Sequence, residues 1–121
     1  MSQKSTGVVQ GTLDMLILKT VALEPFHGYG VGLRIEQISK RVFRINAGSL
    51  FPALRRLERQ GLIKRDWRAT ENNRLAKYYL LTEQGRKKLK IEAREWQTQS
   101  VAMDRILEAS SGELRWASSK S

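Results

Sequence analysis

The hydrophobic positions of residues 47–60 follow a helical period. Leu50, Leu54 and Leu57 recur at i, i+4 and i+7, the spacing that places side chains on one buried face of a helix. This pattern predicts a helix from Ala47 to Gln60. The positions that we expect to lie largely off the core side are Ser49, Ala53, Arg55, Arg56 and Arg59.

A strand pattern follows this helix. Residues 62–68 and 75–81 are rich in apolar and aromatic side chains, and the polar segment ATENNR separates them. Asn72 and Asn73 tolerate the dihedral angles of a tight turn, so the pattern predicts a β-hairpin. We expect the strand aromatics to pack the hairpin onto the helices; they are Trp67, Tyr78 and Tyr79.

The apolar segment near the start of the chain predicts a first helix. Thr12 is a good N-cap residue, the helix should run to Leu23, and Pro25 should close it. The segment is apolar on more than one face, and such a helix in a small domain must touch a second surface. We expect that surface to be a dimer interface, with contributions from Leu13, Leu16 and Ile17.

A second helix is predicted after residues 26–30. Gly28 and Gly30 suit a tight turn, and His27, the only histidine, is expected to be a structural residue of that turn. The apolar positions of the helix that follows are Val31, Ile35 and Ile38.

The start of the third helix has two solutions. If Asn46 is the N-cap, Pro52 occupies the sixth helical position, where the missing N–H bends the first turns. If Ser49 is the N-cap, Pro52 occupies the third position without penalty. Gly61 ends the helix in either case.

A long last helix is predicted after Thr82, which is placed to cap it. Its apolar positions are spaced 4, 3, 4, 3, 4, which is a heptad seam with one small polar member. A helix of this length cannot be covered completely by so small a core, so we expect self-association. The residues of this predicted dimer seam are Leu89, Ala93, Trp96, Ser100, Met103 and Leu107.

These elements predict a mainly α fold with a small β-hairpin. The expected organisation is a winged helix-turn-helix over residues 11–82, a C-terminal dimerisation helix over 83–109, and flexible ends at 1–10 and 110–121. A helix that exposes cationic side chains, followed at once by a basic hairpin, is how this fold meets DNA.

The charge distribution favours a nucleic-acid partner. The chain carries +10 overall, and residues 55–90 hold twelve basic residues against four acidic ones. Such a concentration attracts a polyanion, and binding should depend on salt. A membrane surface fits less well, because no basic amphipathic helix with a bulky aromatic face is present.

Composition also bears on chemistry and location. The chain has no cysteine and one histidine, and its carboxylates form no pair near a plausible nucleophile. We therefore expect neither an enzyme nor a metal or cofactor site. No apolar run approaches the roughly 18 residues of a membrane span, so a soluble cytoplasmic protein is expected.

Four segments carry a family resemblance: GTLDMLILKTVAL, HGYG, GSLFPALRRLERQGLI and AKYYLLTEQG. They resemble the PadR family of bacterial transcriptional regulators, in particular its short members with a single C-terminal helix, over roughly residues 11–107. Phe51 stands where family members commonly carry tyrosine, which removes a hydroxyl able to reach DNA. The ENNR wing is most similar to a subgroup often linked to permease-type genes.

The resemblance implies a homodimer that represses transcription from a pseudo-palindromic operator in double-stranded DNA. The third helix would enter the major groove, and the wing would hold phosphates or probe the minor groove. The residues expected at the DNA are Asn46, Ser49, Phe51, Pro52, Arg55 and Arg56 from the helix, with Asn73, Arg74 and Lys77 from the wing.

Two questions stay open at this stage. Trp96 either fills the dimer seam or flanks a cavity for a flat aromatic effector, since some family members bind aromatic compounds between subunits. An architectural protein without sequence preference, or an adaptor that uses the winged fold for protein contacts, would share much of the pattern. The first would bind scrambled DNA equally well, and the second would bind little DNA even at low salt.

Overall fold

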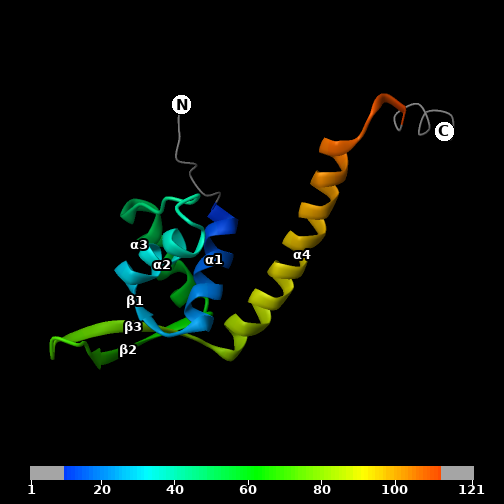
Figure 1. The fold of residues 1–121 in the computed structure, drawn as a ribbon. Helices are drawn as coiled ribbons and strands as arrows, with labels where there is room; N and C mark the ends of the chain where they lie inside the picture. Colours follow the sequence, from blue (N-terminus) through cyan, green and yellow to red (C-terminus); the bar gives the residue numbers. More distant parts are fainter. Residues whose placement is uncertain (1–9, 113–121) are drawn as a thin grey trace. The chain divides into compact units, whose positions relative to one another are not determined.

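The computed structural model describes residues 10–112, so residues 1–9 and 113–121 of the ends predicted to be flexible lie outside the described residues. The described elements are α1 (Gln10–Leu23), β1 (Phe26–His27), α2 (Gly28–Ile38), α3 (Ala47–Arg59), β2 (Ile63–Ala69), β3 (Leu75–Leu81) and α4 (Glu83–Glu108). The chain forms two compact units that divide within α4, between Lys90 and Ile91. The fold is mainly helical with a small antiparallel sheet, as predicted (Figure 1).

Helix α1 contributes much of the core of the first unit. It begins at Gln10, so Thr12 lies inside the helix and is not its N-cap, contrary to prediction. Leu13 and Ile17, expected at a dimer interface, are instead buried among the other helices of the same chain, and Ile17 has no exposed surface. Leu16 is partly buried against this core. The apolar circumference of α1 is therefore explained largely by contacts within the subunit.

The glycines before the second helix belong to that helix rather than to a turn. His27 is the N-cap of α2, and its Nδ1 accepts a hydrogen bond from the Gly30 N–H at 3.1 Å. A Cβ on Gly30 would lie 2.2 Å from the Phe26 ring, and one on Gly28 would lie 3.0 Å from the Phe51 ring. Close packing, and not turn geometry, requires these glycines. Ile38, one of the apolar positions of the predicted helix, is exposed.

The structure shows which of the two candidate residues caps α3. The Asn46 side chain accepts a hydrogen bond from the Ser49 N–H at 2.9 Å, so Asn46 is the N-cap and Pro52 lies inside the helix. The predicted buried face is confirmed, but Ala53, expected off the core, is 1% exposed. The helix ends at Arg59 with Gln60 as its C-cap, and Gly61 follows with a φ of +77°, which suits a residue without a side chain.

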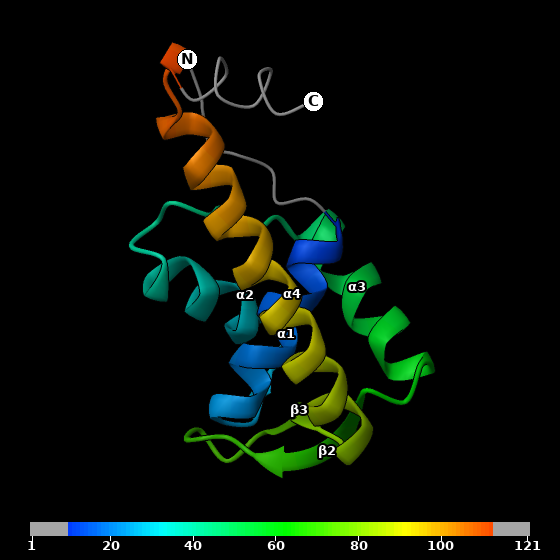
Figure 2. The same cartoon turned by 90° about the vertical axis from the view of Figure 1, so that its right-hand side faces the viewer.

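The sheet has the strand order β1-β3-β2 (Figure 1), and its two longer strands, β2 and β3, lie side by side in Figure 2. The predicted hairpin is confirmed, with Ile63 opposite Leu81 at one end and Ala69 opposite Leu75 at the other. Asn73 has a φ of +63°, the left-handed conformation that asparagine tolerates in a turn. Strand β1 is only two residues long and was not predicted, because so short a segment has no periodicity.

The start of α4 is fixed to the hairpin. The Thr82 hydroxyl accepts a hydrogen bond from the Gly85 N–H at 2.9 Å and donates one to the Gly61 carbonyl at 2.7 Å, which confirms Thr82 as the cap. A Cβ on Gly85 would lie 2.0 Å from the Leu62 carbonyl oxygen, so glycine permits this close approach. Leu89 packs partly against the core.

Candidate nucleic-acid interface

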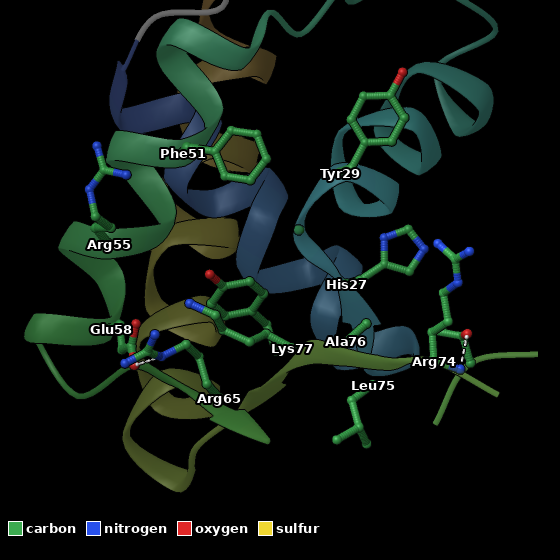
Figure 3. Close-up of a pocket in the computed structure, with 13 residues that line it drawn as sticks. His27, Tyr29, Phe51, Arg55, Glu58, Arg65, Arg74, Leu75, Ala76 and Lys77 are labelled. Atoms are coloured by element: carbon green, nitrogen blue, oxygen red, sulfur yellow. Dashed lines mark hydrogen bonds and ion pairs between the residues drawn. The ribbon is translucent and has the colours of Figure 1, made fainter. Parts of the chain in front are cut away.

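A groove lies between the start of α2, helix α3 and the hairpin (Figure 3). Its volume is about 630 Å³. Its floor is formed in part by Tyr79 and Gly28, and its walls carry long polar side chains. The lining residues are His27, Gly28, Tyr29, Phe51, Arg55, Glu58, Arg65, Thr70, Arg74, Leu75, Ala76, Lys77 and Tyr79.

The groove is cationic. Arg55 comes from α3, Arg65 from β2, Arg74 from the hairpin turn and Lys77 from β3, so one helix and all parts of the hairpin direct positive charge to one place. Glu58 is the one acidic residue among the described residues that line the groove. A concave, positively charged surface beside an exposed helix attracts the phosphates of a nucleic acid.

An ion pair ties α3 to the hairpin inside this groove. The Arg65 Nε donates to the Glu58 carboxylate at 2.5 Å, and both side chains remain partly exposed. Burial raises the pKa of the neighbouring Tyr79 hydroxyl above its ordinary value of 10.0, and the Glu58 charge raises it further, whereas Arg65 and Arg55 lower it. Tyr79 is therefore a neutral phenol at physiological pH.

The residues predicted on α3 fall into two groups. Ser49, Pro52 and Arg55 are exposed, and Asn46 is exposed while its side chain caps the helix. Phe51 projects from α3 toward α2 and is half-buried against the core, so its ring is not presented freely on the helix surface (Figure 3).

Arg56 lies on a different side of α3 from the one predicted. Its guanidinium forms an ion pair with Asp14 of α1 at 2.5 Å, and both side chains are largely buried. Residues one apart on a helix point about 100° apart, so Arg55 lines the groove while Arg56 faces α1. Arg56 therefore holds α3 to α1 and is not directed toward the groove, contrary to its prediction as a DNA-binding residue.

The predicted wing residues are available at the surface. Asn73 and Arg74 form the exposed turn, and the Arg74 N–H bonds the Thr70 hydroxyl at 3.3 Å. Lys77 lines the groove, with its ammonium 5.8 Å from the centre of the Trp67 ring. The prediction that Trp67 packs onto the helices is wrong, because its side chain is 60% exposed.

The other two strand aromatics do pack the hairpin onto the rest of the domain. Tyr79 is 8% exposed, and Tyr78 contacts Phe26 and His27 edge to face. Trp67 lies farther along the hairpin, beyond the reach of the helices that bury Tyr79. Hydrophobic pattern alone could not separate these positions.

The predicted dimer seam is accessible in the unit formed by the second half of α4. Ala93, Trp96, Met103 and Leu107 are exposed, and Ser100 is intermediate. Leu107 is the most exposed of the large apolar residues among them, at 82%.

Tyr29 and Arg65 are among the groove residues that were not predicted from the sequence. Tyr29 is exposed in the first turn of α2, within the HGYG segment that was interpreted only as a turn. Arg65 alternates with Trp67 along β2, a period-two pattern that places both side chains on one face. That alternation was a usable signal.

Within residues 10–112, no group of three or more His, Asp or Glu side chains is arranged to hold a metal ion. No helix in the described part of the chain is long and apolar enough to cross a membrane.

Comparisons with known proteins agree with this geometry. A PadR family transcriptional regulator from Eggerthella lenta is 31% identical over 84% of this chain and 86% of its own, with a TM-score of 0.68. A protein from Streptococcus mutans is 30% identical over 86% of this chain and 93% of its own, with a TM-score of 0.74. A PadR-like regulator from Bacillus cereus shares the fold at 24% identity, covers 84% and 96% of the two chains, and has a TM-score of 0.75.

The family model adds the assignment. The model for the transcriptional regulator PadR-like family matches residues 17–91, which include the core helices, the groove and the start of α4. This family and the structural neighbours named above as regulators act in transcription and are not enzymes. The chain therefore belongs to the transcriptional regulator PadR-like family and is a DNA-binding transcriptional regulator with a winged helix fold.

Proposed function

We propose that this protein is a homodimeric repressor that binds a pseudo-palindromic operator through α3 and the hairpin. The observation that carries the proposal is the groove in which Arg55 of α3 converges with Arg65, Arg74 and Lys77 of the hairpin. Four cations around one concavity attract a polyanion such as DNA, and neutralising its phosphates would release counterions.

In this proposal the first turns of α3 read the major groove. Ser49 and Pro52 are exposed on these turns, and Arg55 follows at the groove edge. Arginine recognises guanine O6 and N7 with two hydrogen bonds, and serine contacts several base edges. The Asn46 side chain caps α3 and so fixes where the helix begins. In this proposal Asn46 therefore positions α3 and does not specify a base.

The hairpin positions the protein on the DNA backbone. Asn73 and Arg74 lie at its turn, and Lys77 lies on the strand that borders the groove. Contacts of this kind to phosphate and sugar fix register and orientation without carrying sequence information. Phe51 of α3 forms part of the groove wall, and its ring packs close to Gly28.

The proposed dimer forms through the seam on α4. Trp96, Met103 and Leu107 are exposed apolar residues on one heptad face, and burying each would contribute about 1.5–3 kcal/mol. Two subunits related by a two-fold axis would require two DNA half-sites with the same relation, about one helical turn apart.

A small aromatic effector is a second proposal for the same seam. Trp96 stands between the small residues Ala93 and Ser100, so a two-fold pair of indoles would leave space for a flat apolar molecule. In the alternative, the indoles stack on each other and fill the seam. Quenching of Trp96 fluorescence by planar aromatic compounds, together with release of operator DNA, would support the effector.

The proposed function is tested by duplex binding with matched arginine variants. Replacing Arg55 with alanine should weaken binding by about 1–3 kcal/mol and relax the preference at one base pair of each half-site. Arg59→Ala is the control, because Arg59 is exposed one turn further along α3 and does not line the groove. Equal losses for both variants, or equal affinity for selected and scrambled duplexes, would contradict specific recognition.

Repression and assembly need separate measurements. Light scattering should give about twice the 13.9 kDa mass of one chain. A reporter gene with the selected operator at its promoter should be expressed less when the protein is present. A monomer at micromolar concentration, or increased expression, would contradict the dimer or the repressor respectively.

A further inference from the structure

We infer that Trp67 contacts DNA, with its indole lying against the sugar-phosphate backbone beside the wing. This inference rests on the proposed function and adds a residue that the sequence pattern had assigned to core packing. It begins from the exposure of a large aromatic side chain on the hairpin. Trp67 lies in the middle of β2 with a side chain 60% exposed, although indole is among the largest apolar groups a protein carries.

The register of the hairpin shows which way this side chain faces. Trp67 pairs with Lys77, and Arg65 pairs with Tyr79 two positions closer to the core. Alternate residues of a strand share a face, so these four side chains lie on one face of the hairpin. Tyr79 is buried and Arg65 pairs with Glu58 of α3. The face that carries Trp67 is therefore the one directed toward α3 and the groove.

Lys77 links the indole to the groove directly. Its ammonium lies 5.8 Å from the centre of the Trp67 ring, within the range of a cation–π contact, and Lys77 itself lines the groove. The pair thus presents an apolar plate and a positive charge side by side at the groove rim. Figure 3 shows Lys77 and Arg65 reaching the groove from the two strands.

The charge of the hairpin determines which partner this surface fits. Residues 63–81 contain five basic residues against the two acids Asp66 and Glu71, and Asp66 is paired with Arg68. A second copy of this chain would bring the same positive charge to the contact and would be repelled. A polyanion with apolar sugar rings between its charges matches both parts of the surface, since aromatic rings combined with basic residues are how proteins bind nucleic-acid strands.

The contact would be independent of base sequence. The ring would cover a deoxyribose, the indole N–H would donate to a phosphate oxygen, and Lys77 would pair with the adjacent phosphate. Replacing Trp67 with alanine should therefore lower the affinity for selected and for scrambled duplexes by the same factor. We expect roughly five- to tenfold, the lower part of the range for aromatic contacts to nucleic acid. Trp67→Phe should retain part of the affinity.

Two readouts on one variant separate this inference from the proposed function. The chain contains three tryptophans, and replacing Trp96 and Trp116 with phenylalanine leaves Trp67 as the sole indole. Anisotropy of a labelled duplex reports DNA binding, and indole emission reports the surroundings of Trp67. We expect the emission to change along the same binding curve as the anisotropy. Acrylamide should quench the indole emission in the free protein and not in the complex.

Controls make each outcome decisive. Leu23→Ala removes another exposed apolar side chain that does not line the groove and should leave DNA affinity unchanged, while thermal melts check that each variant is folded. A rise in anisotropy with unchanged emission, and wild-type affinity for Trp67→Ala, would overturn the inference but leave the proposed function standing. Absence of duplex binding by the wild-type protein would overturn both. Concentration-dependent shielding of Trp67 without DNA would show that a second copy covers it.

Discussion

Removing the negative charge of Glu58 should strengthen DNA binding. Glu58 is the acidic member of the groove lining, and its carboxylate holds the Arg65 guanidinium. In Glu58→Gln the shape of the side chain is nearly preserved, whereas the charge that competes with phosphate is lost. Arg65 would then be free to pair with the DNA backbone.

The magnitude follows from counterion release. The binding constant of a protein for duplex DNA varies with salt to the power of about −0.9 for each phosphate neutralised. One additional contact at about 0.15 M salt should therefore raise affinity by roughly fivefold, or about 1 kcal/mol. The folded state should lose only about 0–1 kcal/mol, because the Glu58–Arg65 pair is partly exposed to solvent.

The assay is a salt titration of duplex affinity, measured by anisotropy for the wild type and the variant. Glu58→Gln should bind more tightly at low salt, and its logarithmic salt slope should be steeper by about 0.9. Glu24→Gln is the matched control. It removes the same charge and also releases an arginine, since Glu24 pairs with Arg34 at 3.3 Å, but neither residue lines the groove.

Two results would refute the reasoning. An unchanged salt slope for Glu58→Gln would mean that Arg65 does not reach phosphate and that the groove is not where the backbone lies. An equal gain for Glu58→Gln and Glu24→Gln would mean that total charge, and not its position in the groove, governs binding.

Three further predictions concern stability. Gly85→Ala should lower the free energy of unfolding by about 1–3 kcal/mol in denaturant titrations, because its Cβ would meet the Leu62 carbonyl oxygen at 2.0 Å; Gly11→Ala, with open space around it, should not destabilise. Asn46→Ala should cost about 0.5–2 kcal/mol in the same assay through loss of the α3 cap, and wild-type stability would contradict that role. The raised pKa of Tyr79 means that its neutral form is favoured in the folded state, so this stabilisation is present below pH 10.0 and is lost as pH rises through the higher folded pKa. Tyr79→Phe should flatten this alkaline decline in thermal melts, and an unchanged decline would rule Tyr79 out as its source.

The elements that sequence predicted well are those with local signals. The i, i+4, i+7 leucines of α3, the Asn73 turn and the Thr82 cap each depend on neighbours within a few residues, and the structure has all three. The two glycines at the start of α2 were misinterpreted because tertiary packing, and not local backbone conformation, requires them. Gly28 and Gly30 make room for the rings of Phe51 and Phe26, which no local pattern reveals.

The errors at the site have a similar cause. Arg55 and Arg56 are the same residue type at adjacent positions. Arg55 lines the groove, whereas Arg56 forms a structural ion pair, because α1 places Asp14 beside Arg56 only. Trp67 and Tyr79 are equivalent as strand aromatics, and the point at which the helices stop covering the sheet decides which of them is buried. Both distinctions depend on helix placement, which follows from the packing of the whole domain.

The central property proposed for this protein is specific recognition of a two-fold DNA site through the groove and α3. Selection of binding sites from a random duplex pool, read by sequencing, tests it most directly. We expect one enriched motif with two inverted half-sites about one helical turn apart, and a loss of preference within each half-site for Arg55→Ala. A pool that is retained without enrichment, or a motif that Arg55→Ala leaves unchanged, would contradict it.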